Sequence, residues 1–173
     1  MPPPESREER CVRLLHEFDR PLRRLVSSYE RDAVRQQDLV QEIWLAVWQA
    51  LPRFRGECSE RTFVFRIAHN RAISHVDYSH RRRAEPLDED AQIVAADPDP
   101  EHSLSAKQRH ERLLAAVQQL DVGPRQVVVL ALEGISHAEI AEIVGITENN
   151  VAVRLSRARA VLSRLLGAAE VRS

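Results

Sequence analysis

The run ENNVAVRLSRARA, near the carboxyl end of the sequence, places asparagine and arginine side chains at spacings suited to reading DNA bases. Asn149 and Asn150 carry amides that form paired hydrogen bonds with adenine, and Arg154 and Arg157 carry guanidinium groups that do the same with guanine. A small apolar side chain such as Val153 fits against the methyl group of thymine. This chemistry requires a helix that presents these side chains to the major groove and buries its opposite face.

The spacing of apolar residues predicts that helix. A buried stripe recurs at helical intervals and comprises Val151, Leu155, Ala158, Leu162 and Leu165. The candidates for base contacts lie opposite this stripe or on its flanks: Asn149, Asn150, Ala152, Val153, Arg154, Ser156 and Arg157.

Helix-capping signals predict a second, shorter helix directly before it. Ser136 and Glu139 have the spacing of a capping box, Gly145 is suited to end the short helix, and Thr147 is suited to begin the next one. Two helices joined by a tight glycine turn make a helix-turn-helix, which we predict over residues 136–165. The alternative is an ordinary helical hairpin with a solvated polar face.

A second group of residues suits single-stranded nucleic acid. The segment PRFRGECSERTFVFRIAHNRAISHVDYSHRRR mixes aromatic rings, on which bases stack, with arginines, which pair with phosphates. The alternative is that Phe63 and Phe65 belong to the protein core. We expect His69, His75 and His80 on the nucleic-acid face or in solvent. The candidates for contacts are Arg53, Arg55, Arg61, Phe63, Arg66, Asn70, Arg71, Arg81, Arg82 and Arg83.

A third pattern, DLVQEIWLAVWQALPRFRG, predicts a helix with more apolar surface than one core requires. We expect Asp38 to cap this helix, with Gln41 completing a capping-box-like pair, and Pro52 to end it. A surface helix of a small protein normally has one apolar stripe and a broad polar face. The surplus therefore predicts a protein-docking surface, whose candidate residues are Asp38, Gln41, Glu42, Trp44, Leu45 and Trp48.

Charge is unevenly distributed along the chain of 173 residues, whose net charge is −1. Residues 1–83 carry +4, residues 84–105 carry −7, and residues 106–173 carry +2. The acidic segment contains three prolines and no sustained periodicity, so we predict a flexible linker there. It is either a plain spacer or an acidic strap that shields a basic groove.

Several classes of protein do not fit the sequence. The two cysteines, Cys11 and Cys58, form no C-x-x-C pair, which suits a reducing cytosol. No apolar run approaches the roughly 18 residues of a membrane span, and MPPPESREER reads as a disordered lead-in over residues 1–11 rather than a signal peptide. We find no glycine-rich phosphate loop, metal-ligand cluster or nucleophile with a base. We therefore expect no enzyme activity, cofactor, metal or small-molecule substrate.

Two stretches together resemble a known family. DLVQEIWLAVWQALPRFRG followed by RTFVFRIAHNRAI resembles region two of bacterial extracytoplasmic-function sigma factors, and LDVGPRQVVVLALEGISHAEIAEIVGITENNVAVRLSRARAVL resembles their region four. The resemblance implies an all-α fold with two small helical domains joined by the acidic flexible linker. Region two would occupy residues 12–83, the linker 84–105, region four 106–166, and a short tail 167–173.

The resemblance also implies partners and roles. Sigma factors of this family bind core RNA polymerase and direct it to promoters, and an anti-sigma protein usually holds them inactive. The helix at 38–51 would dock on the polymerase clamp helices, and residues 53–83 would bind the −10 element and help to open the duplex. The helix at 148–165 would read the −35 element. The resemblance implies that the protein acts in the cytoplasm and does not insert into a membrane.

This sequence departs from the family pattern at three positions. Phe63 stands where the family commonly has tryptophan, Ser74 where it often has aspartate, and Ala152 where it often has lysine or arginine. Two other classes stay open on the residues alone. One is a stand-alone helix-turn-helix regulator, which would bind as a dimer, and the other is an adaptor that binds only protein.

Overall fold

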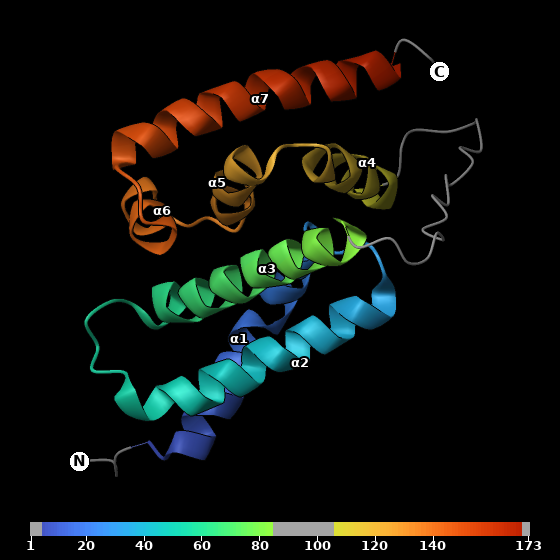
Figure 1. Cartoon of the computed structure of the whole chain (residues 1–173). Helices are drawn as coiled ribbons and strands as arrows, with labels where there is room; N and C mark the ends of the chain where they lie inside the picture. Colours follow the sequence, from blue (N-terminus) through green and yellow to red (C-terminus); the bar gives the residue numbers. More distant parts are fainter. Residues whose placement is uncertain (1–4, 85–105, 171–173) are drawn as a thin grey trace.

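The computed structural model describes residues 5–84 and 106–170, and this part of the chain is all helical, which confirms the predicted fold class. The first half contains three α-helices and a short 3-10 helix, and the second half contains four α-helices (Figure 1). The predicted linker, apart from Ala84 at the end of the third helix, lies outside the described residues. The elements are α1 (Arg7–Ser27), α2 (Ala33–Ala50), η1 (Leu51–Arg53), α3 (Glu60–Ala84), α4 (Ala106–Gln118), α5 (Val122–Leu132), α6 (His137–Val144) and α7 (Glu148–Glu170).

Helix α1 begins earlier than the sequence suggested. Ser6 and Glu9 form a capping box, in which each side chain accepts a hydrogen bond from the backbone N–H of the other residue. The expected disordered lead-in over residues 1–11 is therefore wrong from this cap onward, because the cap satisfies N–H groups that the first turn would leave unpaired. Pro21 lies inside the same helix and does not end it.

Helix α2 also begins earlier, at Ala33. Its N-cap is Asp32, whose carboxylate accepts the backbone N–H of Arg35 at 2.9 Å. The prediction that Asp38 caps this helix is wrong, because Asp32 already satisfies the first turn and the intervening residues continue it. Asp38 and Gln41 are consequently interior positions whose side chains are exposed.

The first half is a three-helix unit built around α3. Phe65 on α3 is fully buried and meets Phe18 on α1 edge to face, with ring centroids 6.2 Å apart. Leu22, Leu25, Ile43 and Val47 complete this core from α1 and α2. Phe65 is thus a core residue, as the structural alternative for this segment proposed.

The second half contains the predicted helix-turn-helix. Ser136 and Glu139 form the predicted capping box of α6, and Gly145 ends that helix at φ 75°, a left-handed conformation that glycine adopts without steric cost. Thr147 accepts the backbone N–H of Asn150 at 3.2 Å and so begins α7. Val151, Leu155, Ala158 and Leu162 are buried as predicted, and Leu165 is partly buried.

Helix α7 continues farther than expected. It ends at Glu170, so the predicted tail over residues 167–173 is helical at its start. Leu165 and Leu166 pack against the core at the level where the tail was expected to begin. That packing and the following alanines, which favour helix, extend the element.

The two halves pack on each other. Figure 1 shows α3 between the α1–α2 pair and the layer that contains α4, α5 and α6, with α7 outermost. Contacts join α3 to α6, and the buried apolar side chains of both halves form one continuous cluster. The side-chain amide of Gln118 also donates to the backbone carbonyl of Ser27 at 2.7 Å.

We predict that Leu155→Ala lowers the free energy of unfolding by about 2–5 kcal/mol, because Leu155 is 3% exposed and its loss leaves a cavity beneath α7. The measurement is urea unfolding followed by circular dichroism. The matched control is Val153→Ala on the same helix, which removes a side chain that is 39% exposed and should cost about 0.5 kcal/mol or less. Equal losses for both variants would contradict the buried stripe.

Candidate nucleic-acid and polymerase interfaces

The outer face of α7 presents the predicted base-reading side chains. Six of the seven candidates are exposed, and Arg154 is half-buried. The exposed six are Asn149, Asn150, Ala152, Val153, Ser156 and Arg157. They occupy the first turns of the second helix of the helix-turn-helix, which is the part that enters the major groove in such motifs.

Arg154 is positioned by its own helix. Its Nε donates to the side-chain oxygen of Asn150 at 3.1 Å, one turn earlier. Its guanidinium also lies against Gly123 at the start of α5, where an added Cβ would stand 3.4 Å from Nη1. Asn149 and Arg157 are therefore better placed for free contact with a base than Arg154.

The predicted single-strand face divides between two sides of α3. Asn70, Arg71 and Arg81 are exposed along the helix. Arg61 and Arg66 are half-buried, because their guanidinium groups meet the second half of the protein. Arg82 and Arg83 lie in α3, and their side chains are outside the described part of the structure.

The loop before α3 carries a pair of stacked rings. Phe54 and Phe63 lie with their centroids 4.5 Å apart, and the guanidinium of Arg10 lies 4.9 Å from the centre of the Phe54 ring. Arg53 and Arg55 flank Phe54 and are exposed. Phe63 is half-buried, so one ring of this pair is anchored while the surrounding arginines face outward. Phe54 was missed in the sequence, where only its alternation with Arg53 and Arg55 distinguished it.

Three acidic residues of the second half, Glu133, Glu139 and Glu142, face the same side of α3. The sequence singled out Glu139 only as a helix cap and did not single out the other two. Arg66 forms an ion pair with Glu142, and Arg61 donates to the backbone carbonyl of Glu133. The Thr62 hydroxyl lies 2.8 Å from a carboxylate oxygen of Glu139. Only the acidic residues of α6, set opposite an arginine-rich helix, could have indicated such pairing.

His69 lies in the core and not on a nucleic-acid face. It is 5% exposed, and burial lowers the pKa of its imidazole to about 4. Its Nδ1 is buried without a hydrogen-bond partner among the described residues. The expectation for His69 is therefore wrong. His75 is half-buried and pairs with Glu30, at 2.7 Å between Nε2 and a carboxylate oxygen, and the side chain of His80 lies outside the described part.

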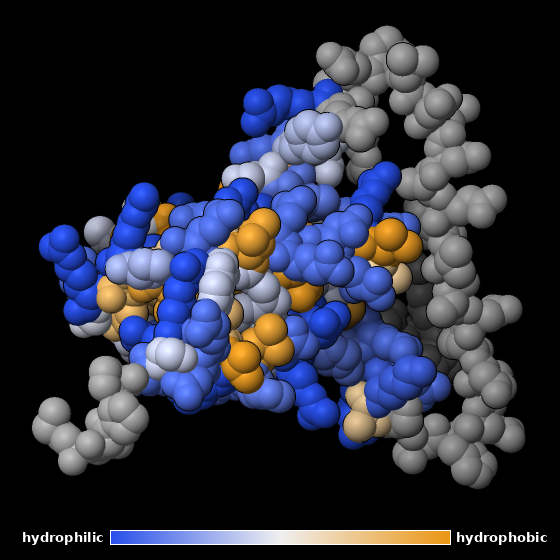
Figure 2. Space-filling model, turned by 90° about the horizontal axis from the view of Figure 1, so that it is seen from below, coloured by the Kyte–Doolittle hydropathy of each residue, from blue (hydrophilic) through white to orange (hydrophobic). Residues whose placement is uncertain are grey.

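The outer side of α2 is open. Asp38, Gln41 and Glu42 are exposed, and Leu45 is 57% exposed. The face formed by α1 and α2 shows separate apolar patches among hydrophilic side chains (Figure 2). Exposed apolar residues on these two helices are Val12, Leu15, Val34 and Leu45.

The two tryptophans of α2 are less accessible to a partner than expected, because side chains of α1 contact both rings. Trp44 donates its indole N–H to Asp19 at 3.2 Å, and the guanidinium of Arg7 stacks 3.8 Å from the centre of the Trp48 ring. Both side chains remain half-exposed. Much of the surplus apolar surface of α2 therefore packs inside the protein, and Leu45 is the apolar side chain left most open among the candidates.

Within residues 5–84 and 106–170, no cluster of three or more histidine, cysteine, aspartate or glutamate side chains is arranged to hold a metal ion. In the same part of the chain, no helix combines the length and apolarity needed to cross a membrane.

Comparison with known families matches both halves. The family model for sigma-70 region 2 matches residues 14–83, and the model for sigma-70 region 4 matches residues 110–162. The chain is 37% identical over 139 residues to the RNA polymerase sigma factor CnrH of Cupriavidus metallidurans, covering 76% of this chain and 73% of that protein. It is 31% identical over 139 residues to the RNA polymerase sigma factor NccH of Alcaligenes xylosoxydans, covering 78% and 74%.

Solved structures agree with this match. The structure of CnrH in complex with the cytosolic domain of CnrY superposes with a TM-score of 0.67 at 26% identity, covering 91% of this chain and 88% of that one. The sigma factor RpoE of Bartonella quintana, in complex with the anti-sigma factor NepR, gives a TM-score of 0.75 over 90% and 96%. Its 24% identity bears on the fold alone.

The two matched regions and these relatives define the class, and the chain belongs to the sigma-70 family as an extracytoplasmic-function sigma factor. It is a transcription initiation factor that directs RNA polymerase to promoters. Members of this family bind core RNA polymerase and promoter DNA and act as transcription factors, not as enzymes.

We predict that acid destabilises the protein through His69. The folded-state pKa, about 4, lies below the ordinary value of 6.5, so the unfolded chain binds the proton first as pH falls. This contribution is complete above about pH 6.5, is reduced by about 2 kcal/mol at pH 5, and is lost on approaching pH 4. The measurement is urea unfolding at pH 7 and pH 5 for the wild type and His69→Leu.

The Leu variant should lose less stability than the wild type between these two pH values. His16→Gln, which changes an exposed histidine of α1, should keep the wild-type difference. An identical pH dependence for wild type and His69→Leu would show that this imidazole is not the acid-sensitive group.

Proposed function

We propose that this sigma factor uses three separate surfaces: α3 with its preceding loop for the −10 element, α7 for the −35 element, and the outer side of α2 for core polymerase. The main support is that the helix-turn-helix exposes a face of asparagine and arginine side chains on α7. The outer side of α2 likewise exposes polar side chains and one large apolar side chain, Leu45. Each surface carries side chains that are complementary to its proposed partner.

At the −35 element, Asn149 and Arg157 would read base edges in the major groove. Their side chains are exposed and free to form the paired hydrogen bonds that adenine and guanine accept. Arg154 and Asn150 already bond to each other and would act as a unit. Val153, 39% exposed, suits a thymine methyl group, and Ala152 and Ser156 line the same face.

At the −10 element, the exposed arginines would pair with the phosphates of the separated strand. Asn70, Arg71 and Arg81 lie along α3, and Arg53 and Arg55 lie in the loop beside the Phe54–Phe63 ring pair. An aromatic surface beside cations suits an unstacked base. Arg61, Phe63, Arg66, Arg82 and Arg83 complete the proposed set.

At the polymerase surface, Asp38, Gln41 and Glu42 would face a basic partner, with Leu45 as the apolar contact. An exposed apolar side chain beside carboxylates gives a contact both area and charge complementarity. Trp44 and Trp48 would contribute their exposed edges only, since α1 occupies the rest of each ring.

We further propose that an anti-sigma protein regulates this chain, that it acts in the cytoplasm and that it has no catalytic activity of its own. The anti-sigma proposal is supported by the two solved relatives, each of which is in a complex with another protein. The rival function is a stand-alone helix-turn-helix regulator. A stand-alone regulator would bind DNA without polymerase, whereas a sigma factor requires polymerase to bind its promoter.

We predict that the free protein binds promoter duplex weakly and that core polymerase converts this into sequence-specific binding. Phosphate neutralisation supplies most non-specific affinity, and the net charge is −1. Glu42→Lys should abolish the gain from polymerase without unfolding the protein, because an exposed carboxylate contributes little stability. The measurement is fluorescence anisotropy of labelled promoter DNA with and without core enzyme.

The matched control is Glu17→Lys, the same charge reversal at an exposed position on α1. It should retain the gain from polymerase. Tight, specific binding by the free protein as a dimer would favour the stand-alone regulator. Unchanged polymerase binding by Glu42→Lys would move the docking surface away from α2.

We predict that Arg157→Ala costs about 1–3 kcal/mol of discrimination at one base pair of the −35 element. Arg164→Ala, an exposed change two turns farther along α7, should weaken binding less and equally for all sequences. The measurement is holoenzyme binding to a panel of single-base variants of the −35 element. A uniform effect of Arg157→Ala across that panel would make it a phosphate contact.

A further inference from the structure

We propose that Arg10 of α1 is a positioning residue for promoter recognition, which holds the loop over residues 54–59 in the shape that receives an unpaired base of the −10 element. The inference rests on the proposed role of this loop and names a residue that acts through it. Arg10 lies outside the proposed −10 set and reaches the loop from another helix. Its guanidinium group contacts Phe54 at one end of the loop and Glu60 directly after the other end.

The contact with Glu60 fixes the guanidinium group of Arg10 against the start of α3. Nε and Nη2 of Arg10 each lie 2.7 Å from the same carboxylate oxygen of Glu60. Arg13, one turn later on α1, donates to both oxygens of that carboxylate, at 2.8 and 3.0 Å. The hydrogen bonds from Arg13 keep the pKa of the Glu60 carboxyl below its ordinary value, so the carboxylate is charged at neutral pH. Two arginines of α1 therefore share one carboxylate at the first residue of α3.

The contact with Phe54 fixes the other end of the loop. The guanidinium carbon of Arg10 lies 4.9 Å from the centre of the Phe54 ring, which is within the range of a cation–π contact. Phe63 contacts the same ring, with centroids 4.5 Å apart and ring planes inclined by 37°. The backbone N–H of Phe54 donates to the carbonyl of Leu51 at 3.1 Å, at the end of η1. Phe54 is therefore held by α1, by α3 and by its own backbone.

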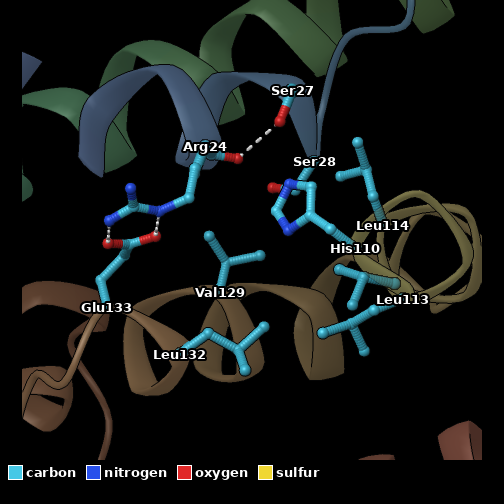
Figure 3. A pocket seen from close by; sticks show the side chains of 10 residues that line it. Arg24, Ser27, Ser28, His110, Leu113, Leu114, Val129, Leu132 and Glu133 are labelled. Atoms are coloured by element: carbon cyan, nitrogen blue, oxygen red, sulfur yellow. Dashed lines mark hydrogen bonds and ion pairs between the residues drawn. The ribbon is translucent and has the colours of Figure 1, made fainter. Parts of the chain in front are cut away.

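Arg10 differs from Arg24, another arginine of α1 that pairs with a carboxylate. Arg24 donates to both carboxylate oxygens of Glu133 at 2.8 and 2.6 Å, and Figure 3 shows this pair joining α1 to the end of α5. That pair connects one helix to another. Arg10 instead connects residue 54 to residue 60, which flank a single loop, and so restricts the shape of the loop itself.

The loop gains from such support because its backbone is permissive at the centre. Gly56 has φ 77°, and a Cβ added there would meet nothing within 4 Å. Arg55, Gly56 and Glu57 are all exposed. A loop that is held in its binding shape loses less conformational entropy when DNA binds, and a fixed ring adapts less to the wrong base.

The alternative is a purely structural role, in which the pairs with Glu60 only attach α1 to α3. Arg13 separates the two possibilities. It bonds to Glu60 as Arg10 does, whereas within the described residues the cation–π contact with Phe54 belongs to Arg10 and not to Arg13. A variant of Arg13 therefore removes the helix attachment and leaves the ring contact in place.

The test compares the wild type with Arg10→Ala, Arg13→Ala and Phe54→Ala, each assembled with core polymerase. The probe is a labelled promoter DNA whose −35 part is duplex and whose −10 part is a single strand, in a panel that replaces each −10 base in turn. Fluorescence anisotropy gives the discrimination, which is the ratio of the affinities for the original base and for its replacement. Urea unfolding of each variant checks that it is folded.

Phe54→Ala identifies the −10 position that the loop reads, as the position where discrimination falls most. At that position Arg10→Ala should lower discrimination about fivefold, near the upper size of one cation–π contact at an exposed site. Arg13→Ala should lower it less than about twofold, because this variant loses only solvent-accessible ion pairs. The double variant Arg10→Ala/Phe54→Ala should lose no more discrimination than Phe54→Ala, since Arg10 acts through that ring.

A second variant guards against misfolding of Arg10→Ala. Arg10→Gln keeps a hydrogen-bond donor for Glu60 but loses the cation over the Phe54 ring. It should therefore give the same loss of discrimination as Arg10→Ala.

Three results would overturn the inference and leave the proposed −10 role of the loop standing. Equal losses for Arg10→Ala and Arg13→Ala would mean that Arg10 is structural. A loss for Arg10→Ala that is equal at every −10 position would make it a phosphate contact. Additive losses in the double variant would mean that Arg10 acts independently of Phe54. In contrast, no effect of Phe54→Ala at any position would remove the proposed role of the loop, and this inference with it.

Discussion

Helix α3 packs against α1 and α2 on one side and against α6 on the other, and both halves depend on that double contact. Adjacent residues divide the task, since Phe65 is fully buried among the apolar residues of the first half while Arg66 reaches Glu142 of the second. The apolar side cannot be given up without unfolding the three-helix unit. The polar side can exchange a carboxylate for another anion at little cost to the fold, because exposed ion pairs contribute little stability.

The charged side of α3 bears on how strongly a sigma factor binds DNA. A sigma factor has to bind promoters with polymerase and not alone, so its affinity for DNA must stay low until the partner arrives. The net charge of −1 keeps that affinity low. Arg24, Arg61 and Arg66 are paired within the protein. The arginines that stay exposed along α3 and its loop, together with those of α7, are the ones that we propose for promoter DNA.

Features that depend on near neighbours in the sequence could be predicted, and features that depend on distant pairing could not. The capping box at Ser136, the turn at Gly145 and the stripe through Leu155 follow from local hydrogen bonding and helical spacing, so the helix-turn-helix was predicted correctly. The start of α2 was missed because Asp32 and Asp38 are equally good caps in isolation. The burial of His69 and the Arg24–Glu133 pair, which joins residues 109 positions apart, depend on tertiary packing that periodicity does not encode.

In the structure α3 contacts α6, and we propose that in the transcription complex α3 binds promoter DNA instead. Energy transfer between two dyes tests it most directly, with one at Arg35→Cys on α2 and one at Ser163→Cys on α7, both exposed, after Cys11 and Cys58 are replaced by serine. Transfer should be high in the free protein and fall when core polymerase and promoter DNA are added. Transfer that stays equally high in the promoter complex would contradict the account, because the two halves would then bind the promoter without separating.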